Sequence, residues 1–233
     1  PLLSPAWFPK NTNYIAFVAL RRDGSAIKVI NLRTNKVAII NSSPGINGAP
    51  AWSPDGKYLA FVLSKEGAPK IYVSKLATNE LRRITHGGSI DTEPSWDPDG
   101  KSIVFTSNRG GSPQIYRISL LTGEVGRITS RGNYNATPSL TPDGKHLVML
   151  HKDPQGNFNI ASQNMVSDEL VVLTDSNFNE SPSIAPNGMM ILYGTREMER
   201  GIINGVSLDG RLHMRLPLQD VNAKEPAWSP YLF

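Results

Sequence analysis

An eight-residue pattern built around a proline and a tight turn recurs along the chain and constrains its fold more than any other feature. The clearest copy reads Pro50-Ala51-Trp52-Ser53-Pro54-Asp55-Gly56-Lys57, and further copies cover residues 94–101, 138–145 and 182–188. The first prolines of all copies lie at positions 5, 50, 94, 138, 182 and 226. These positions are 44 residues apart, apart from a first interval of 45, so the chain is predicted to consist of repeated structural units.

Each repeat is predicted to form four short strands. In the second repeat we expect strands at residues 51–53, 58–64, 70–76 and 81–85, because these runs are rich in β-branched and aromatic residues and end at turn residues. In the turn between the first two strands, Pro54 presets its own φ and Gly56 accepts a positive φ. A four-stranded unit of about 40–50 residues has the size of a β-propeller blade.

The number of repeats predicts an all-β propeller over residues 1–233 and leaves its closure open. Five complete units cover residues 5–49, 50–93, 94–137, 138–181 and 182–225, and we expect the first strand of each to be innermost. Residues 226–233 then supply one more innermost strand. Either five blades close with this strand as a supplement, or it belongs to a sixth blade whose other three strands lie outside the chain.

Four tryptophans each lie two residues after an anchor proline, namely Trp7, Trp52, Trp96 and Trp228. We predict that these rings pack between neighbouring blades, since a buried aromatic side chain covers a large apolar area. The alternative is an aromatic platform for a ligand. Leu140 and Ile184 occupy the same position in other repeats, which favours packing.

Composition excludes several classes of protein. The 39% of hydrophobic and 19% of charged residues are typical of a globular chain. The net charge is +4, but no run of Lys and Arg exceeds two residues, which argues against nucleic-acid binding. No stretch reaches the roughly 18 apolar residues of a membrane-spanning helix, so we do not expect an integral membrane protein. There is no cysteine and therefore no disulfide.

The repeat, which follows the pattern PxWSPDGKxLAF…IYxxxLxTGxxxxLT, resembles that of the TolB propeller family. Four further segments strengthen the resemblance, at residues 47–50, 206–211, 215–217 and 225–232. The resemblance implies a six-bladed propeller that follows an N-terminal α/β domain, and residues 1–233 contain neither that domain nor three strands of the sixth blade.

The resemblance also implies a function. Family members are periplasmic proteins of the Tol-Pal system, which connects the outer membrane, peptidoglycan and inner membrane and supports envelope constriction at cell division. Their propeller binds the peptidoglycan-associated lipoprotein Pal, and colicins exploit it in some bacteria. Contacts with other Tol proteins such as TolA belong to the N-terminal region. We therefore expect a protein-binding module and not an enzyme.

The binding surface is predicted on one end of the propeller. Because consecutive strands alternate in direction, the connections from a fourth strand to the next first strand emerge on the same side as those between second and third strands. The family's Pal-binding surface lies on this side, and loops on a rigid scaffold often carry function. Position by position, the resemblance points to Ile46, Asn47, Ala49, Thr92 and Glu93, and the repeat extends the prediction to Gly48, Asp91, Asn135, Ala136, Thr137, Asn179, Glu180, Ser181, Lys224 and Glu225.

Two enzyme classes share this kind of propeller and are the alternatives to a binding module. A peptidase lid requires a hydrolase domain with a G-x-S-x-G motif, which the chain lacks. A metal-dependent lyase requires several histidines converging in the channel, and the four histidines fall at different levels of the repeat. We expect no catalytic residue, no metal ligand and no cofactor, with a calcium ion held by channel aspartates and backbone carbonyls left open.

Overall fold

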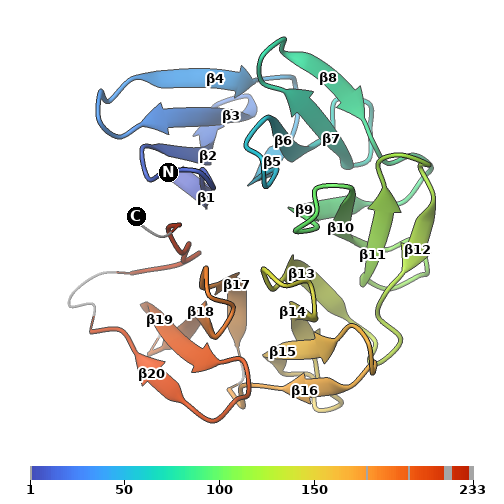
Figure 1. Cartoon of the computed structure of the whole chain (residues 1–233), viewed down its shortest axis with the longest axis vertical. Helices are drawn as coiled ribbons and strands as arrows, with labels where there is room; N and C mark the ends of the chain where they lie inside the picture. The colour runs from blue at the N-terminus through green and yellow to red at the C-terminus, as the bar shows by residue number, and fades with distance from the viewer. Residues whose placement is uncertain (1, 177, 199, 218–221, 231–233) are drawn as a thin grey trace.

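The computed structural model describes residues 2–176, 178–198, 200–217 and 222–230 and contains five four-stranded antiparallel sheets arranged around an axis (Figure 1). In each sheet the strands follow one another in chain order, and the first strand lies nearest the axis. Blade one consists of β1 (Leu2–Trp7), β2 (Tyr14–Arg21), β3 (Gly24–Asn31) and β4 (Val37–Asn41), and blade two of β5 (Asn47–Trp52), β6 (Tyr58–Leu63), β7 (Lys70–Lys75) and β8 (Glu80–Arg83). Blade three consists of β9 (Asp91–Trp96), β10 (Ser102–Ser107), β11 (Gln114–Ser119) and β12 (Val125–Arg127), and blade four of β13 (Asn135–Leu140), β14 (His146–Lys152), β15 (Phe158–Asn164) and β16 (Leu170–Val172). Blade five consists of β17 (Asn179–Ile184), β18 (Met190–Glu197), β19 (Arg200–Ser207) and β20 (His213–Arg215). The predicted propeller of four-stranded blades with innermost first strands is confirmed.

The innermost strands begin earlier than predicted. Strand β5 starts at Asn47, whereas the sequence placed the strand at 51–53 and residues 45–49 in a loop. The pairing of β5 with β6 shifts register between Gly48 and Ala51, which marks a β-bulge around Pro50. A bulge tolerates proline because its residues need no ladder hydrogen bond. The proline therefore lies inside the strand, and the prediction that the strand begins after it, at residue 51, was wrong.

The residue before each anchor proline has a left-handed backbone. The φ values are 51° at Ser4, 48° at Ala49, 53° at Glu93, 50° at Thr137, 53° at Ser181 and 52° at Glu225. A positive φ is uncommon outside glycine, and six occurrences at equivalent positions show that the bulge is part of the repeat. The sixth occurrence, at Glu225, lies beyond the last strand of the fifth blade.

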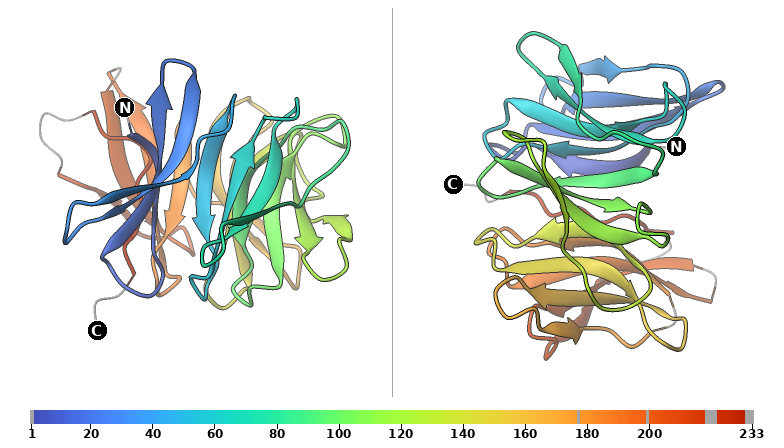
Figure 2. Two further views of the ribbon diagram at one scale, coloured as in Figure 1. Left: turned by 90° about the horizontal axis from the view of Figure 1, so that it is seen from above. Right: turned by 90° about the vertical axis from the view of Figure 1, so that its right-hand side faces the viewer.

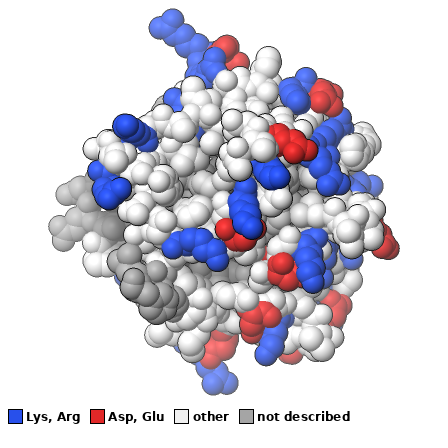
Figure 3. Space-filling model, turned by 45° about the horizontal axis from the view of Figure 1, so that its top comes forward, with Lys and Arg blue, Asp and Glu red and all other residues white. Residues whose placement is uncertain are grey.

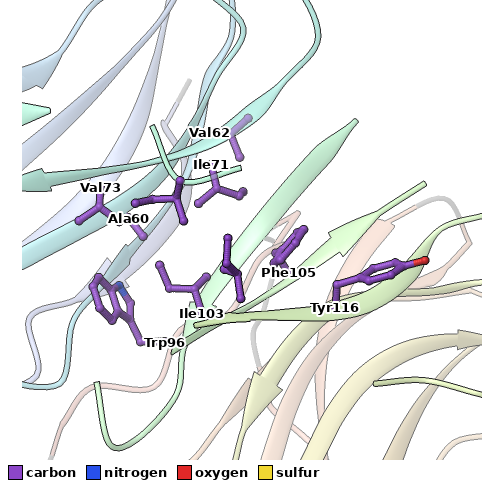
Figure 4. Close-up of a cluster of buried hydrophobic side chains, with 10 residues drawn as sticks. Ala60, Val62, Ile71, Val73, Trp96, Ile103, Phe105 and Tyr116 are labelled. Atoms are coloured by element: carbon purple, nitrogen blue, oxygen red, sulfur yellow. The ribbon is translucent and has the colours of Figure 1, made fainter. Parts of the chain in front are cut away.

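Apolar residues on both faces of the blades form separate cores between neighbours. In strand β6, Ala60 and Val62 pack against Ile103 and Phe105 of the third blade (Figure 4). The alternating residues of β6, with Phe61 among them, pack instead against the first blade. Further clusters join blades three and four and blades four and five. The sheets of blades two, three and four are therefore covered on both faces by apolar contacts with their neighbours. Figure 2 shows the blades side by side from two directions.

The tryptophans pack between blades and bond to the preceding one. The Trp96 side chain is 8% exposed, and its indole nitrogen donates to the Ala51 carbonyl at 3.0 Å. Trp52 donates in the same way to Ala6 at 3.0 Å but remains half-buried. The prediction of a buried wedge is confirmed for Trp96 and holds in part for Trp52.

The C-terminal segment lies beside the first blade. Trp7 donates its indole hydrogen to the Ala227 carbonyl at 3.2 Å, the same contact that Trp52 makes one blade further on. The backbone N–H of Trp228 donates to Ser183 Oγ of the fifth blade at 3.0 Å. Residues 226–230 thus lie between blades five and one but form no strand, and the described residues make five blades rather than six.

Among the described residues, no helix is long and apolar enough to cross a membrane.

Candidate protein-binding face

One end of the propeller carries two kinds of connection, which we call together the loop face. It comprises the connections between blades (42–46, 84–90, 128–134, 173–176) and those between second and third strands (22–23, 64–69, 108–113, 153–157). The two kinds touch directly, since Ser64 N donates to the Ile46 carbonyl at 3.0 Å and Asn108 N to that of Ile90 at 3.3 Å. This contact confirms that both connections emerge on the same side.

Each connection between blades is held at an apolar residue near its tip. The amide of Ile46 donates to Ser64 Oγ at 2.8 Å, and the amide of Ile90 donates to Asn108 Oδ1 at 2.7 Å. In the fourth blade, Lys152 N donates to the carbonyl of Tyr134 at 3.0 Å. Because both the amide and the carbonyl of each isoleucine are bonded, its position is fixed before any partner arrives.

The exposure of these apolar residues differs around the face. Ile46 is 55% exposed and Ile90 is 46% exposed, so both side chains project into solvent. Tyr134 instead packs edge-on against Phe158, with ring centroids 5.3 Å apart. Burial raises the pKa of the Tyr134 hydroxyl, and Glu93 adds to the shift. The apolar surface offered to a partner therefore concentrates on the side of blades one to three.

Several basic side chains at this end of the propeller lie over aromatic rings. The Lys65 Nζ is 5.0 Å from the ring centroid of Tyr72, and the corresponding distance from Arg196 Cζ to Phe178 is 4.4 Å. Cation–π contacts of this kind hold long side chains in place. On the side shown in Figure 3, Lys and Arg are interspersed with Asp and Glu, which is not the continuous basic patch of a nucleic-acid binder.

Four predicted contact residues point into the blades instead of toward a partner. Their side chains are buried and hydrogen-bonded, which corrects their assignment to exposed loops: they are Asn47, Asp91, Asn135 and Asn179. Asn179 Nδ2, for example, donates to the Phe158 carbonyl at 2.8 Å. In Asp91, Asn135 and Asn179 the short polar side chain at the start of the innermost strand thus ties that strand to the preceding blade, whereas that of Asn47 bonds carbonyls of its own connection. These residues shape the loop face, and a partner cannot contact them without displacing it.

The predicted residue Glu93 also has a structural role. Its Oε2 accepts hydrogen bonds from the Thr137 amide at 2.9 Å and from Thr106 Oγ1 at 2.7 Å. Glu225 makes the equivalent contact with the amide of Ser4. Each carboxylate therefore bonds the left-handed residue of the next blade, so a change at Glu93 would alter this contact as well as any partner contact.

The remaining predicted residues differ in their accessibility. Ala136 is buried, whereas Gly48, Ala49, Thr92, Thr137, Glu180 and Ser181 are half-buried. Lys224 is exposed. The sequence-based selection did not include Ile90, Asn108 and Arg109. For Ile90 the sequence did carry a signal, because Ile90 lies 44 residues after Ile46 and so has the same position in the repeat.

Comparisons with known proteins agree with this architecture. A family described as the TolB beta propeller domain matches residues 1–232. The Tol-Pal system protein TolB of Legionella pneumophila is 50% identical over 75 residues, which are 32% of this chain and 18% of that protein. The TolB crystal structure from Acinetobacter baumannii superimposes with a TM-score of 0.93 at 43% identity and covers 99% of this chain.

The matched regions are parts of longer relatives. The chain spans 58% of the Acinetobacter structure and a smaller part of the curated Legionella protein. An oligogalacturonate lyase in complex with manganese matches with a TM-score of 0.64 at 18% identity over 91% of this chain and 64% of the lyase, which shows a shared fold alone. With the repeat, the five blades and the match over residues 1–232, the chain belongs to the TolB β-propeller domain family.

Proposed function

We propose that this chain is a periplasmic protein-binding module of a Tol-Pal system and that its loop face binds the lipoprotein Pal. In this role it supports outer-membrane integrity and envelope constriction at cell division. The observation that carries the proposal is a rigid face with exposed isoleucines on a propeller whose relatives are named Tol-Pal system protein TolB. The names of these relatives state no catalytic activity.

The physical properties of the face suit a protein partner. Apolar side chains near the centre of an interface, with polar and charged groups around them, are typical of protein–protein contacts. Ile46 and Ile90 supply the apolar part, and Lys65 and Arg109 lie on the neighbouring connections. Since the loops are already hydrogen-bonded to each other, binding loses little conformational entropy.

Calorimetric titration with Pal tests the proposal. Burying an isoleucine side chain contributes roughly 1.5–3 kcal/mol, so Ile46→Ser and Ile90→Ser should each weaken binding about tenfold or more. The matched control is Leu121→Ser, because Leu121 is also a large apolar residue and is 91% exposed, but lies in the turn between β11 and β12 at the other end of the third blade. If Pal fails to bind the unaltered protein, or binds all three variants equally, the proposed face is wrong.

Other partners follow from the same proposal. A colicin that uses the loop face should compete with Pal, and competition in the same titration would reveal it. Contacts with other Tol proteins are assigned by the resemblance to a region outside residues 1–233.

The enzyme alternatives gain no support from a specific arrangement of side chains. Likeness to the lyase is a likeness of fold. Within the described ranges, no group of three His, Asp or Glu side chains is placed to hold a metal ion, so no side chains there support the ligand set of a lyase. A channel calcium ion held by aspartates and backbone carbonyls stays a prediction.

We also propose that residues 226–230 occupy the place of an innermost strand in a sixth blade. The left-handed Glu225, its contact with Ser4 and the bond from Trp7 to Ala227 repeat what the other innermost strands show. Hydrogen exchange at the Trp7 indole should then be as slow as at Trp52. Fast exchange at Trp7 alone would contradict this placement.

A further inference from the structure

A buried ionic cluster lies at the junction between blades two and three, directly beneath the loop face. The Lys70 side chain is 2% exposed, and its Nζ lies 3.0 Å from Oδ2 of the fully buried Asp91. Lys70 also bonds the backbone carbonyl of Ser89. The other carboxylate oxygen, Oδ1, accepts from Ser107 Oγ at 2.6 Å and from Arg109 Nη2 at 3.0 Å.

The charges of this cluster do not balance. Lys70 and Arg109 contribute two positive charges, and Asp91 contributes one negative charge, which leaves one positive charge in excess. A net charge in a partly buried site is costly, and an anion that approaches it is attracted more strongly than it would be in water. Only Arg109 carries this charge to the surface, since its side chain is 25% exposed.

An open depression of about 490 Å³ adjoins the Arg109 side chain. It is lined by His86, Gly87, Gly88, Ser89, Asn108 and Arg109. Nothing lies within 4 Å of the positions where a Cβ on Gly87 or Gly88 would be, so this turn is open to solvent. Several groups of these lining residues can donate hydrogen bonds. They are the Arg109 guanidinium, the His86 imidazole, the Asn108 side-chain amide and the glycine N–H groups.

The orientation of the guanidinium is fixed from two sides. Its Cζ lies 5.1 Å from the ring centroid of Phe105 and 5.0 Å from that of Tyr116. The Nε donates to Ser107 Oγ at 3.0 Å and Nη2 donates to Asp91. Within the described part of the chain, Nη1 has no hydrogen-bond partner, and it remains available to a ligand. A guanidinium held in one plane is well suited to bind a carboxylate.

We propose that this depression binds a carboxylate group of the protein that docks on the loop face. The inference rests on the proposed function and adds the chemistry that the partner must bring: an aspartate or glutamate side chain, or a chain terminus, placed within reach of Ile90. Arg109 contacts the carboxylate, and Asp91 acts as a positioning residue that holds the guanidinium. Because the buried Lys70 already pairs with the single carboxylate of Asp91, the positive charge of Arg109 is not fully balanced.

A titration with sodium acetate tests the site without any partner protein. In NMR spectra, the amide signals of Gly87, Gly88 and Ser89 and the Arg109 Nε–H signal should shift and saturate with acetate at millimolar concentrations. Sodium chloride at equal ionic strength should not reproduce the shifts. Arg109→Gln should abolish them, and Arg109→Lys should weaken them. Shifts that are unsaturable, or equal with chloride, would overturn the proposal.

Titrations with Pal then test the role of the site in docking. Arg109→Gln should weaken Pal binding about tenfold at low salt and reduce its salt dependence. The matched control is Lys152→Gln, because Lys152 also lies over an aromatic ring, Phe158, at 5.4 Å, but follows His151 of the neutral junction, where Asn135 donates to Gln114. Equal losses in both variants would mean that general surface charge acts, and would contradict a specific site.

The outcomes separate this inference from the proposed function. If acetate saturates the site but Pal does not bind, the carboxylate site stands and the proposed partner fails. If Pal binds but Arg109→Gln leaves its affinity unchanged, the docking face stands and the carboxylate contact is wrong. A Pal variant with a short C-terminal extension identifies the source of the carboxylate, since it would lose affinity only if the chain terminus binds.

Discussion

The junction between blades two and three and the junction between blades three and four share one geometry but differ in charge. In the first, Lys70 and Asp91 form an ion pair with Nζ and Oδ2 3.0 Å apart. In the second, the residues 44 positions later are neutral, and Asn135 Nδ2 donates to Gln114 Oε1 at 2.8 Å. Ser107 of the ionic junction is replaced by His151, whose Nδ1 lies 2.8 Å from Asn135 Oδ1.

The backbone around both junctions is the same. The amide of Ile71 donates to Thr85 Oγ1 at 3.0 Å, and that of Ile115 donates to Thr129 Oγ1 at 3.1 Å. A buried ion pair contributes little stability over a neutral pair of similar shape. The repeat therefore specifies where a polar side chain must reach the preceding blade, and leaves its charge free to serve another purpose. At the ionic junction that purpose is the proposed carboxylate site.

The largest effect should come from the apolar part of the two junctions. Trp96 lies between blades two and three, and Leu140 occupies the same repeat position between blades three and four. Trp96→Ala should lower the free energy of unfolding by about 3–5 kcal/mol, since it leaves a cavity. It also leaves the Ala51 carbonyl without its indole donor. Denaturant unfolding measures the loss.

The control for this change is Trp96→Leu, which copies the residue of the neighbouring junction. It keeps most of the apolar contact and should recover a substantial part of the loss. If Trp96→Ala leaves the unfolding midpoint unchanged, the tryptophan does not hold the blades together.

Removing the charge of Asp91 should have the next largest effect. Asp91→Asn leaves the buried ammonium of Lys70 without a carboxylate, and breaking a buried pair in this way costs about 3 kcal/mol. The double variant Lys70→Gln with Asp91→Asn copies the neutral junction and should restore most of the stability. Thermal unfolding of the single and double variants compares them, and a double variant as unstable as the single one would show that the two junctions are not interchangeable.

The comparison also shows what the sequence could reveal. The anchor prolines and the strand patterns predicted the repeat, the four strands and the common side of the two kinds of connection, because turn residues and spacing are local properties. The start of each innermost strand was missed because the strand was placed after the anchor proline, at residues 51–53 in the second repeat, whereas the bulge lets it run from Asn47. The inward orientation of Asp91 could not be predicted, since Lys70 lies 21 residues earlier and meets it only after two blades stack.

The smallest effect should be a difference in pH dependence between the junctions. Burial lowers the pKa of His151 below its ordinary 6.5, so the folded protein holds this ring neutral. Below pH 6.5 the unfolded chain therefore binds more protons at His151 than the folded protein does. The neutral junction loses stability as the pH falls from 6.5 to the lowered pKa of His151 in the folded protein. Burial alone would raise the pKa of Asp91, but bonds from Ser107, Arg109 and Lys70 outweigh it and lower the pKa below 3.8. The ionic junction therefore keeps its contribution above pH 3.8 and loses it only as the pH falls through the lowered value.

Urea unfolding at pH 7.5 and 5.5 tests this difference, because the interval lies across the ordinary pKa of histidine and above that of aspartate. The unaltered protein should have a lower midpoint at pH 5.5, and His151→Gln should reduce the difference. The control His213→Gln removes an exposed ring in β20 and should leave the difference as it is. If His151→Gln keeps the full pH dependence, the neutral junction is not its source, and the contrast between the two junctions would be limited to their charge.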